Sequence, residues 1–360
     1  MNTELWLEQQ SPAKHPSNAP RLLVILGLLL SMSTLLPVVY LALRALGDGG
    51  DWSFLHSPRI FHIFINTILL VLIVSAGCGV IGVSLAWLTV RTTLPFRRLI
   101  TILTALPFVI PSYIAGFLFA TAFAPQGVIQ GLVEPIGITE LPGMSGLIGA
   151  SFTLILVSYP YVLLPVRVSL SRIDPAIEDA ARGLGLGPWR TFFQVTLPSV
   201  RPSIMAGTLL VALYTISDFG AVSLMRFETF TWAIFIHYES GINIVMASRL
   251  SLFLIGLALV LLLIDSSSKR NVPYYRVTPG SPKPSSNLGL NRWVIPALIY
   301  CGLLISCGLL LPVGILAHWL TQGISSSQSL GDLWVPAWQS LYISALAAII
   351  SMTCSIPIAI

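Results

Sequence analysis

Charged side chains are scarce in this chain of 360 residues, since Asp, Glu, Lys and Arg together make up 9% of it. That is too little charge to solvate soluble domains of this total size, and it also excludes a disordered chain. Cysteine is equally rare. The four cysteines lie inside apolar runs without zinc or disulfide spacing, which excludes a secreted disulfide scaffold. A hydrophobic content of 55% and a mean hydropathy of +0.86 instead indicate an integral membrane protein.

Long apolar runs are what the chain has in abundance. A helix that spans a membrane needs about 20 mostly apolar residues. Eight runs meet this need, at approximately residues 22–46, 61–90, 99–123, 146–166, 204–224, 247–264, 293–320 and 338–360. The first run is too long for a signal-peptide core and has no small-residue cleavage site after it, so we expect an uncleaved anchor behind a polar tail, residues 1–21. The sequence predicts an all-α protein with several membrane spans.

Basic residues show on which side of the membrane each loop lies. If the N-terminus is cytoplasmic, 15 of the 19 basic residues fall on the inner side. They are Lys14, Arg21, Arg91, Arg97, Arg98, Arg167, Arg172, Arg182, Arg190, Arg201, Lys269, Arg270, Arg276, Lys283 and Arg292. This asymmetry follows the positive-inside rule, so a cytoplasmic N-terminus is predicted.

A short pattern occurs twice in the chain. Leu35-Leu36-Pro37-Val38 followed by Leu41-Ala42 returns as Leu310-Leu311-Pro312-Val313 followed by Leu316-Ala317. The copies lie in the first and seventh runs, so the repeat unit is six helices long. Because six is an even number, both copies face the same way and the pattern predicts a parallel repeat; chance similarity of leucine-rich helices is the alternative. The polar, Ser- and Pro-rich segment 265–292 reads as a cytoplasmic linker between a first half, 22–264, and the start of a second, 293–360, which ends after about two helices.

The inner loop 169–203 predicts two short helices. Asp174 can cap the first, Pro175 suits its first position, and the glycines at 183, 185 and 187 end it. Pro188 can begin the second helix. Its aromatic residues, Trp189, Phe192 and Phe193, form one stripe that needs a covering surface, and Leu197-Pro198 is expected to end this helix before the chain re-enters the membrane.

This loop resembles the coupling loop of binding-protein-dependent ABC importer permeases. The family pattern is Glu-Ala-Ala, three residues, Gly, nine residues, Ile, one residue and Leu-Pro. The matching residues are Asp179, Ala180, Ala181, Gly185, Val195, Leu197 and Pro198, and Glu178 stands just before them as a possible substitute for the family's Glu. An ordinary amphipathic helix pair on the membrane surface is the alternative.

The resemblance implies a six-helix permease half of the MetI-like kind, plus the first two helices of a parallel second repeat. It implies a bacterial inner membrane protein whose first loop helix docks on a separate ABC ATPase dimer, with a periplasmic binding protein and a second permease half or copy as further partners besides lipid. ATP and Mg would bind the partner, and no cofactor or nucleic acid is expected here. None of Lys14, Lys269 or Lys283 ends a phosphate-binding GxxxxGK[ST] loop, so we expect no enzyme.

The cargo is less specified than the class of transporter. The layout resembles the fused two-half permeases of ferric iron importers, in which this second half would be shortened. Ser217-Asp218-Phe219-Gly220-Ala221 is similar to a segment of those permeases and of permeases for sulfate, molybdate and thiamine. Alternating access with ferric iron as cargo is therefore the expectation, and permeases for thiamine, sulfate or molybdate, phosphonate or polyamine are the alternatives.

Two polar positions are candidate sites on the predicted transport route. An acidic residue within a membrane helix is costly unless it faces a polar cavity or a partner, so Asp218 either lines the pathway or makes a structural hydrogen bond. His237, Tyr238 and Glu239 form the one compact group of potential iron ligands, in a predicted outer loop. Adjacency alone supplies no coordination geometry, so a loop that touches a binding protein is the plainer interpretation and no metal site is predicted.

Two other classes of membrane protein were weighed. An ion-gradient transporter should show charged pairs or broken helices near the bilayer centre in inverted halves, and Asp218 alone offers little of this. An integral-membrane enzyme should show clustered His, Glu or Asp residues or an activated nucleophile, and the sequence shows neither, so no catalytic residue is predicted.

Overall fold

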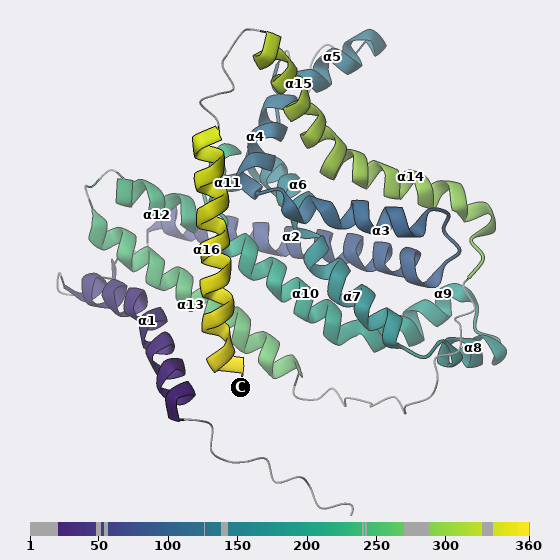
Figure 1. Cartoon of the computed structure of the whole chain (residues 1–360), viewed down its shortest axis with the longest axis horizontal. Helices are drawn as coiled ribbons and strands as arrows, with labels where there is room; N and C mark the ends of the chain where they lie inside the picture. Colours follow the sequence, from purple (N-terminus) through teal and green to yellow (C-terminus); the bar gives the residue numbers. More distant parts are fainter. Residues whose placement is uncertain are drawn as a thin grey trace, which may run out of the picture. The chain divides into compact units, whose positions relative to one another are not determined.

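The computed structural model describes residues 21–47, 52–53, 57–125, 127–137, 143–239, 241, 243–269, 288–325 and 334–359 (Figure 1). The chain forms two compact units, residues 45–322 and the two flanking segments 1–44 and 323–360. Nearly all of the described chain is helical, and the isolated β-bridge within it joins Thr92 to Leu288. The predicted all-α class is confirmed.

The helices follow the predicted apolar runs closely. Seven of the described helical stretches are long and apolar enough to span a membrane, and a bent pair of helices makes an eighth candidate. In chain order the helices are α1 (Arg21–Leu46), α2 (Pro58–Arg91), α3 (Arg97–Ala105), η3 (Leu106–Val109), α4 (Ser112–Ala122), α5 (Val128–Val133), η4 (Glu134–Ile136), α6 (Gly146–Ser158), α7 (Pro160–Arg172), α8 (Pro175–Gly183), α9 (Pro188–Thr191), η5 (Phe192–Thr196), α10 (Leu197–Ser217), α11 (Gly220–Leu224), α12 (Phe230–Glu239), α13 (Ile244–Lys269), η6 (Asn291–Trp293), α14 (Val294–Ile305), η7 (Ser306–Leu310), α15 (Leu311–Ser325) and α16 (Trp334–Ala359).

The third predicted run is a broken span. Its two parts, Arg97–Val109 and Ser112–Ala122, meet at an angle of 97°. Pro107 lies in the short 3-10 turn η3, and Pro111 stands immediately before α4. Because a proline has no backbone N–H to give and its ring crowds the preceding turn, two prolines so close together end one helix and start another in a new direction. The third run is therefore two helices joined at a sharp bend.

The fifth run differs from its prediction at both ends. The helical stretch starts at Pro188 instead of residue 204 and stops at Ser217, after which α11 is a separate short helix. Asp218 adopts an extended conformation with ψ 127 and so ends α10. The predicted single helix across residues 204–224 was therefore wrong at its outer end, because the Asp-Phe-Gly stretch interrupts it.

Small residues set how closely the core helices approach. A Cβ added to Gly82 of α2 would lie 2.8 Å from the backbone N of Leu163, and one added to Gly207 of α10 would lie 2.8 Å from the Cα of Val162. Both glycines therefore let α2 and α10 pack directly on the same turn of α7. Gly82 and the buried Ala86 thus lie on a close-packing face of α2.

Helix α14 and residues 311–322 of α15, which follow the linker, belong to the same compact unit as helices α2 to α13, which precede it. Tyr300 of α14 and Ser84 of α2 share a hydrogen bond of 2.7 Å, and the backbone N–H of Thr93 donates to the carbonyl of Leu288 at 3.1 Å. Helix α13 continues to Lys269, into the predicted linker, and residues 270–287 lie outside the described residues. Residues 45–264 and 293–322 therefore lie in one compact unit, and the parallel repeat stays a prediction from sequence.

Candidate functional site: the inner loop and the end of helix α2

The first helix of the inner loop begins as its sequence predicts. The carboxylate of Asp174 accepts a hydrogen bond of 2.9 Å from the backbone N–H of Ala176, and Pro175 takes the first helical position. This cap satisfies one of the amide groups that every helix start leaves without an intrahelical partner. Helix α8 therefore has a defined start directly after the C-terminal end of α7.

The same helix ends in a Schellman turn built on one glycine. The N–H of Gly185 donates to the carbonyl of Arg182 at 3.0 Å, and the N–H of Leu186 donates to that of Ala181 at 3.2 Å. Gly185 has φ +90, which side chains strongly disfavour, so glycine is the natural residue here. Of the three glycines expected to end the helix, Gly185 alone has a positive φ.

The second loop helix is continuous with a membrane helix, which corrects the sequence prediction. After α9, the chain passes through a π-helical turn, η5, directly into α10, and the N–H of Leu197 donates to the carbonyl of Phe192. Leu197 and Pro198 therefore open α10 and do not end the loop helix. The π turn shifts the hydrogen-bond register, which lets the chain accept Pro198 without breaking the helix.

Glu178 is the residue that ties α8 to the membrane helices. Its Oε1 lies 3.2 Å from Nε of Arg91, the last residue of α2, and accepts a hydrogen bond of 2.9 Å from the hydroxyl of Thr196 in η5. Both side chains of the ion pair are 5% exposed. Arg91 also donates to the carbonyl of Ile173 at 3.1 Å. One buried carboxylate thus links α8, α2 and the turn before α10.

An aromatic cluster makes a second connection to the same helix. Trp87, one turn before Arg91 on α2, stacks on Trp189 with ring centroids 6.1 Å apart and meets Phe192 edge-on at 5.4 Å. Phe193 continues the cluster against both. The predicted aromatic stripe is therefore partly covered by Trp87 of the same chain, while Trp189 and Phe193 remain 61% and 58% exposed.

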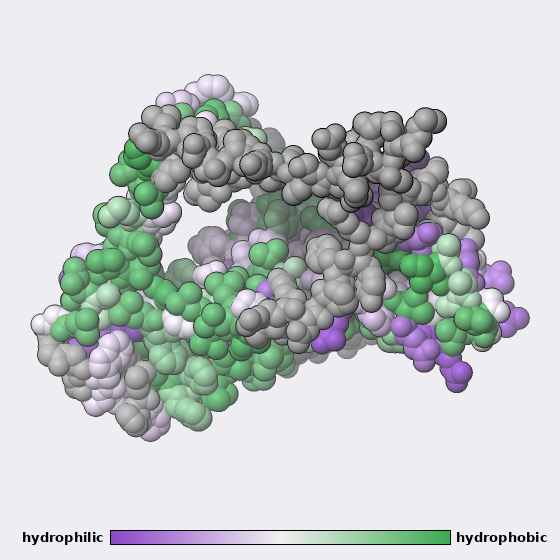
Figure 2. Space-filling model, turned by 90° about the horizontal axis from the view of Figure 1, so that it is seen from below, coloured by the Kyte–Doolittle hydropathy of each residue, from purple (hydrophilic) through white to green (hydrophobic). Residues whose placement is uncertain are grey.

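The remaining residues of the motif differ in their exposure. Asp179 pairs at 2.7 Å with Arg182 on the exposed face of α8, and Ala180 is exposed beside it, whereas Ala181 is buried. Two large apolar side chains flank them, Ile177 and Leu184, which are 49% and 88% exposed. Val195 is half-buried. Figure 2 shows hydrophilic residues gathered at the end of this unit where α8 and α9 lie.

Asp218 lies at the junction of three helices. Its Oδ1 accepts the backbone N–H of Ala221 at 2.9 Å and its Oδ2 accepts the hydroxyl of Ser112, the first residue of α4 after the break. Its carbonyl accepts the hydroxyl of Thr231 at 2.8 Å. The side chain is 7% exposed. The sequence left two roles possible for Asp218, and these contacts are structural hydrogen bonds. They lie where two of the membrane spans are interrupted.

We expect Asp218→Asn to keep most of the stability and Asp218→Ala to lose about 1 to 2 kcal/mol, as for other lost helix caps. The asparagine carbonyl oxygen can still accept from Ala221, whereas alanine leaves that N–H and the Ser112 hydroxyl without the carboxylate. Thermal unfolding of the purified variants measures this. Loss of transport in the asparagine variant at unchanged stability would instead show that the pathway requires the charge.

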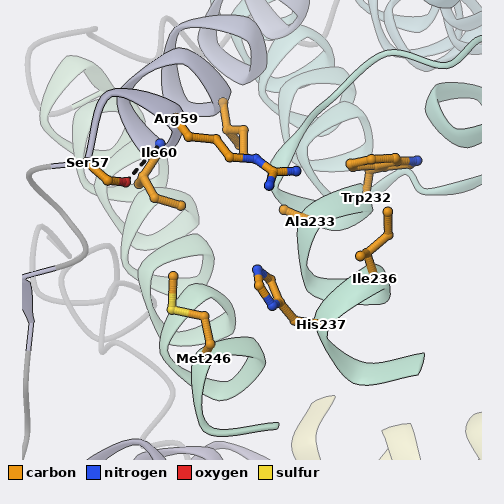
Figure 3. Close-up of a pocket in the computed structure, with 9 residues that line it drawn as sticks. Ser57, Arg59, Ile60, Trp232, Ala233, Ile236, His237 and Met246 are labelled. Carbon is orange, nitrogen blue, oxygen red and sulfur yellow. Dashed lines mark hydrogen bonds between the residues drawn. The ribbon is translucent and has the colours of Figure 1, made fainter. Parts of the chain in front are cut away.

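The predicted outer-loop cluster is the end of helix α12, so its description as a loop was wrong. Consecutive residues on a helix diverge, and the described part of the chain holds no group of three His, Cys, Asp or Glu suited to a metal. His237 instead lines a cavity of about 240 Å³ with Arg59 and Met246 (Figure 3). Burial and the positive charge of Arg59 lower the pKa of His237.

The family of the chain follows from comparison with known proteins. Residues 78–272, more than half of the chain, match the family described as "Binding-protein-dependent transport system inner membrane component". The chain therefore belongs to this family of ABC importer permeases. Its fold is similar to a chain of a bacterial alginate ABC transporter solved with a periplasmic protein, with a TM-score of 0.57 and 17% identity over 69% of this chain and 94% of that one.

Three curated relatives carry different cargo names. The Fe(3+)-transport system permease protein FbpB 2 of Haemophilus influenzae is 29% identical over 95% of this chain and 65% of its own length. A probable sulfate permease protein of Chlorokybus atmophyticus is 33% identical over 52% of this chain and 65% of its own. The molybdenum permease protein ModB of Escherichia coli K12 is 34% identical over 51% and 82%. The chain thus spans less than two thirds of the first two.

Sequence reasoning missed the partners of the loop inside the chain. In the sequence, Arg91 counts only as one of the positive charges that predict the cytoplasmic side, and nothing points to Trp87 or Thr196. Arg91 gives one available signal, because it is a charged residue directly attached to an apolar run of about 30 residues. A charge at that place needs a partner or water, but the sequence alone does not say which.

Proposed function

We propose that this chain is the membrane-spanning subunit of an ATP-driven importer that receives ferric iron from a periplasmic binding protein. A separate ATPase dimer supplies the energy and binds ATP and Mg. The loop 169–203 passes the closure of that dimer to the membrane helices, whose rocking gives alternating access. The N-terminus lies in the cytoplasm of a bacterial cell in this arrangement. A second permease half or copy completes the pathway.

The contact between α8 and α2 is the observation that carries this proposal. A loop that transmits force must present one face to its partner and hold the other firmly to the helices that move. The exposed side of α8 carries Ile177, Ala180 and Leu184, an apolar face of a kind that partner proteins bind. Its inner side is held by Glu178 on Arg91, a buried pair that a free surface helix would not need.

The extent of the similarity favours ferric iron as cargo. The Haemophilus ferric iron permease aligns with 95% of this chain, including the region after residue 292, whereas the sulfate and molybdenum permeases align with about half. The second candidate cargo is sulfate or molybdate, because those relatives have somewhat higher identity over the aligned part. The break at Asp218 lies within residues 78–272, which match the family as a whole, so it does not favour one of these cargoes.

Uptake of radiolabelled ferric iron tests the proposal. Cells that lack this permease receive either the 360-residue chain or its Gly185→Arg variant at matched membrane levels, and sulfate and molybdate uptake is followed in parallel. Iron uptake restored by the parent alone is the expected result. If sulfate or molybdate uptake is restored and iron uptake is not, the proposed cargo is wrong but the proposed class of transporter still holds. Equal iron uptake by both chains would contradict coupling through the loop.

A further inference from the structure

A basic cavity lies at the inner ends of three membrane helices. It has a volume of about 440 Å³ and is lined by the end of α2, the start of α3 and the end of α7. Its charge comes from Arg97, Arg98 and Arg167. No carboxylate of the described residues forms an ion pair with any of them. Residues 270–287, which follow α13, contain no Asp or Glu that could do so.

The first turn of α3 carries positive side chains, which is unfavourable at the N-terminus of a helix unless an anion is bound there. A helix N-terminus carries a partial positive charge and is stabilised by nearby anions, which is why acidic residues are common in the first turn. Here the first turn begins with Arg97 and Arg98 and has no acidic residue, and Phe96 offers no side-chain cap. Two cations therefore add to the positive end of the helix, and a bound anion would relieve the repulsion.

The hydroxyl groups that line the cavity already donate their hydrogen bonds elsewhere, so the arginines are its available hydrogen-bond donors. The hydroxyls of Thr89, Thr101 and Ser171 already donate to carbonyls of their own helices at 2.7 to 2.8 Å. Nε of Arg167 is buried and has no hydrogen-bond partner among the described residues. Arginine stays charged at all relevant pH values and its fork of N–H groups fits phosphate oxygens. Among the described residues, those that line the cavity thus present fixed positive donors and no carboxylate.

We propose that Arg97, Arg98 and Arg167 form a binding site for a phosphate-type oxyanion at the inner face of the membrane. The phosphate of an anionic lipid headgroup and a free phosphate or sulfate share this chemistry. The lipid is the expected source, because Val168 lines the cavity with 50% exposure and Leu164, one turn farther along α7, is 41% exposed. Acyl chains can lie on these side chains while the headgroup meets the arginines. The site does not depend on which cargo is carried.

Two sets of binding experiments on the full chain separate the sources. In the first, the protein is placed in phosphatidylcholine nanodiscs with and without phosphatidylglycerol, and its thermal unfolding is measured. In the second, inorganic phosphate and sulfate are titrated into the phosphatidylcholine nanodiscs. The parent is compared with Arg167→Gln, with the triple Arg97→Gln, Arg98→Gln and Arg167→Gln variant, and with Arg201→Gln, an exposed arginine of α10 outside the cavity.

Stabilisation of the parent and of Arg201→Gln by phosphatidylglycerol is expected, with binding about tenfold weaker in Arg167→Gln and lost in the triple variant. Saturable binding of phosphate or sulfate that the triple variant lacks would assign the site to a free oxyanion. The single variant keeps the test valid if the triple variant fails to fold. Identical behaviour of Arg167→Gln and Arg201→Gln in both experiments would overturn the proposal.

Discussion

Replacing Arg91 with methionine is expected to destabilise the protein by about 3 to 5 kcal/mol, the usual cost of leaving one member of a buried ion pair alone. Glu178 would keep its hydrogen bond from Thr196 but would lose the cation 3.2 Å away while remaining 5% exposed. Thermal unfolding in detergent measures the loss. The Asp179→Asn variant is the stability control, because its pair with Arg182 lies on the surface and should contribute less than about 1 kcal/mol.

A double variant separates folding from coupling at this ion pair. Arg91→Met combined with Glu178→Leu fills the same space with apolar groups, so most of the stability should return. We expect cargo transported per ATP hydrolysed to stay about tenfold below the parent. An apolar contact lacks the charge attraction of the ion pair, the hydrogen bond that Arg91 donates to Ile173 and the one that Glu178 accepts from Thr196. Full recovery of transport per ATP together with stability would show that the pair serves folding alone.

Transport should depend strongly on which side chain replaces Gly185, while membrane insertion is unchanged. The residue has φ +90, and a Cβ there meets no atom of the chain within 4 Å among the residues described. A non-glycine residue at positive φ costs about 1 to 2 kcal/mol. We therefore expect Gly185→Asn, whose side chain tolerates this conformation, to keep more uptake than Gly185→Ala. Gly185→Arg should abolish uptake, because the free space beside the turn is where the ATPase is expected.

Gly187→Ala is the matched control for this series. Gly187 also has open space around it but has φ −66, which any residue adopts. The Gly187→Ala variant should therefore transport as much as the parent at equal membrane abundance. If Gly185→Asn and Gly185→Arg transport equally well, the open space at this turn holds no partner. If Gly187→Ala fails as completely as Gly185→Arg, the effect belongs to the loop in general and not to the Schellman turn.

The sequence alone was sufficient for features that depend on local chemistry. Apolar runs of about 20 residues marked every span, since a lipid environment leaves few alternatives to an apolar helix. Asp174 and Gly185 marked the ends of α8, because capping and a positive φ each require particular residue types within a few positions. Pro107 and Pro111 favour a bend near residue 110, since a proline inside a helix removes a backbone hydrogen bond.

Two predictions failed where a neighbouring turn changed the outcome. Leu197-Pro198 was expected to end a helix, yet the π turn at Phe192–Thr196 carries the chain through it. Asp218 was placed within a continuous helix, yet it ends α10 and accepts hydrogen bonds from α4 and α11. In both cases the prediction followed from a rule for the local sequence. The hydrogen-bond register of each segment also depends on residues that pack against it, which the local sequence does not contain.

The tertiary structure alone decided which carboxylate of the coupling motif faces the membrane helices. Glu178 and Asp179 are adjacent, similar in chemistry and both compatible with the start of α8, so the sequence gives no basis for separating their roles. Neighbouring residues on a helix point about 100° apart, and the end of α2 lies on one side of α8. Arg91 therefore meets Glu178, which is buried, and Asp179 is left at the surface beside Arg182.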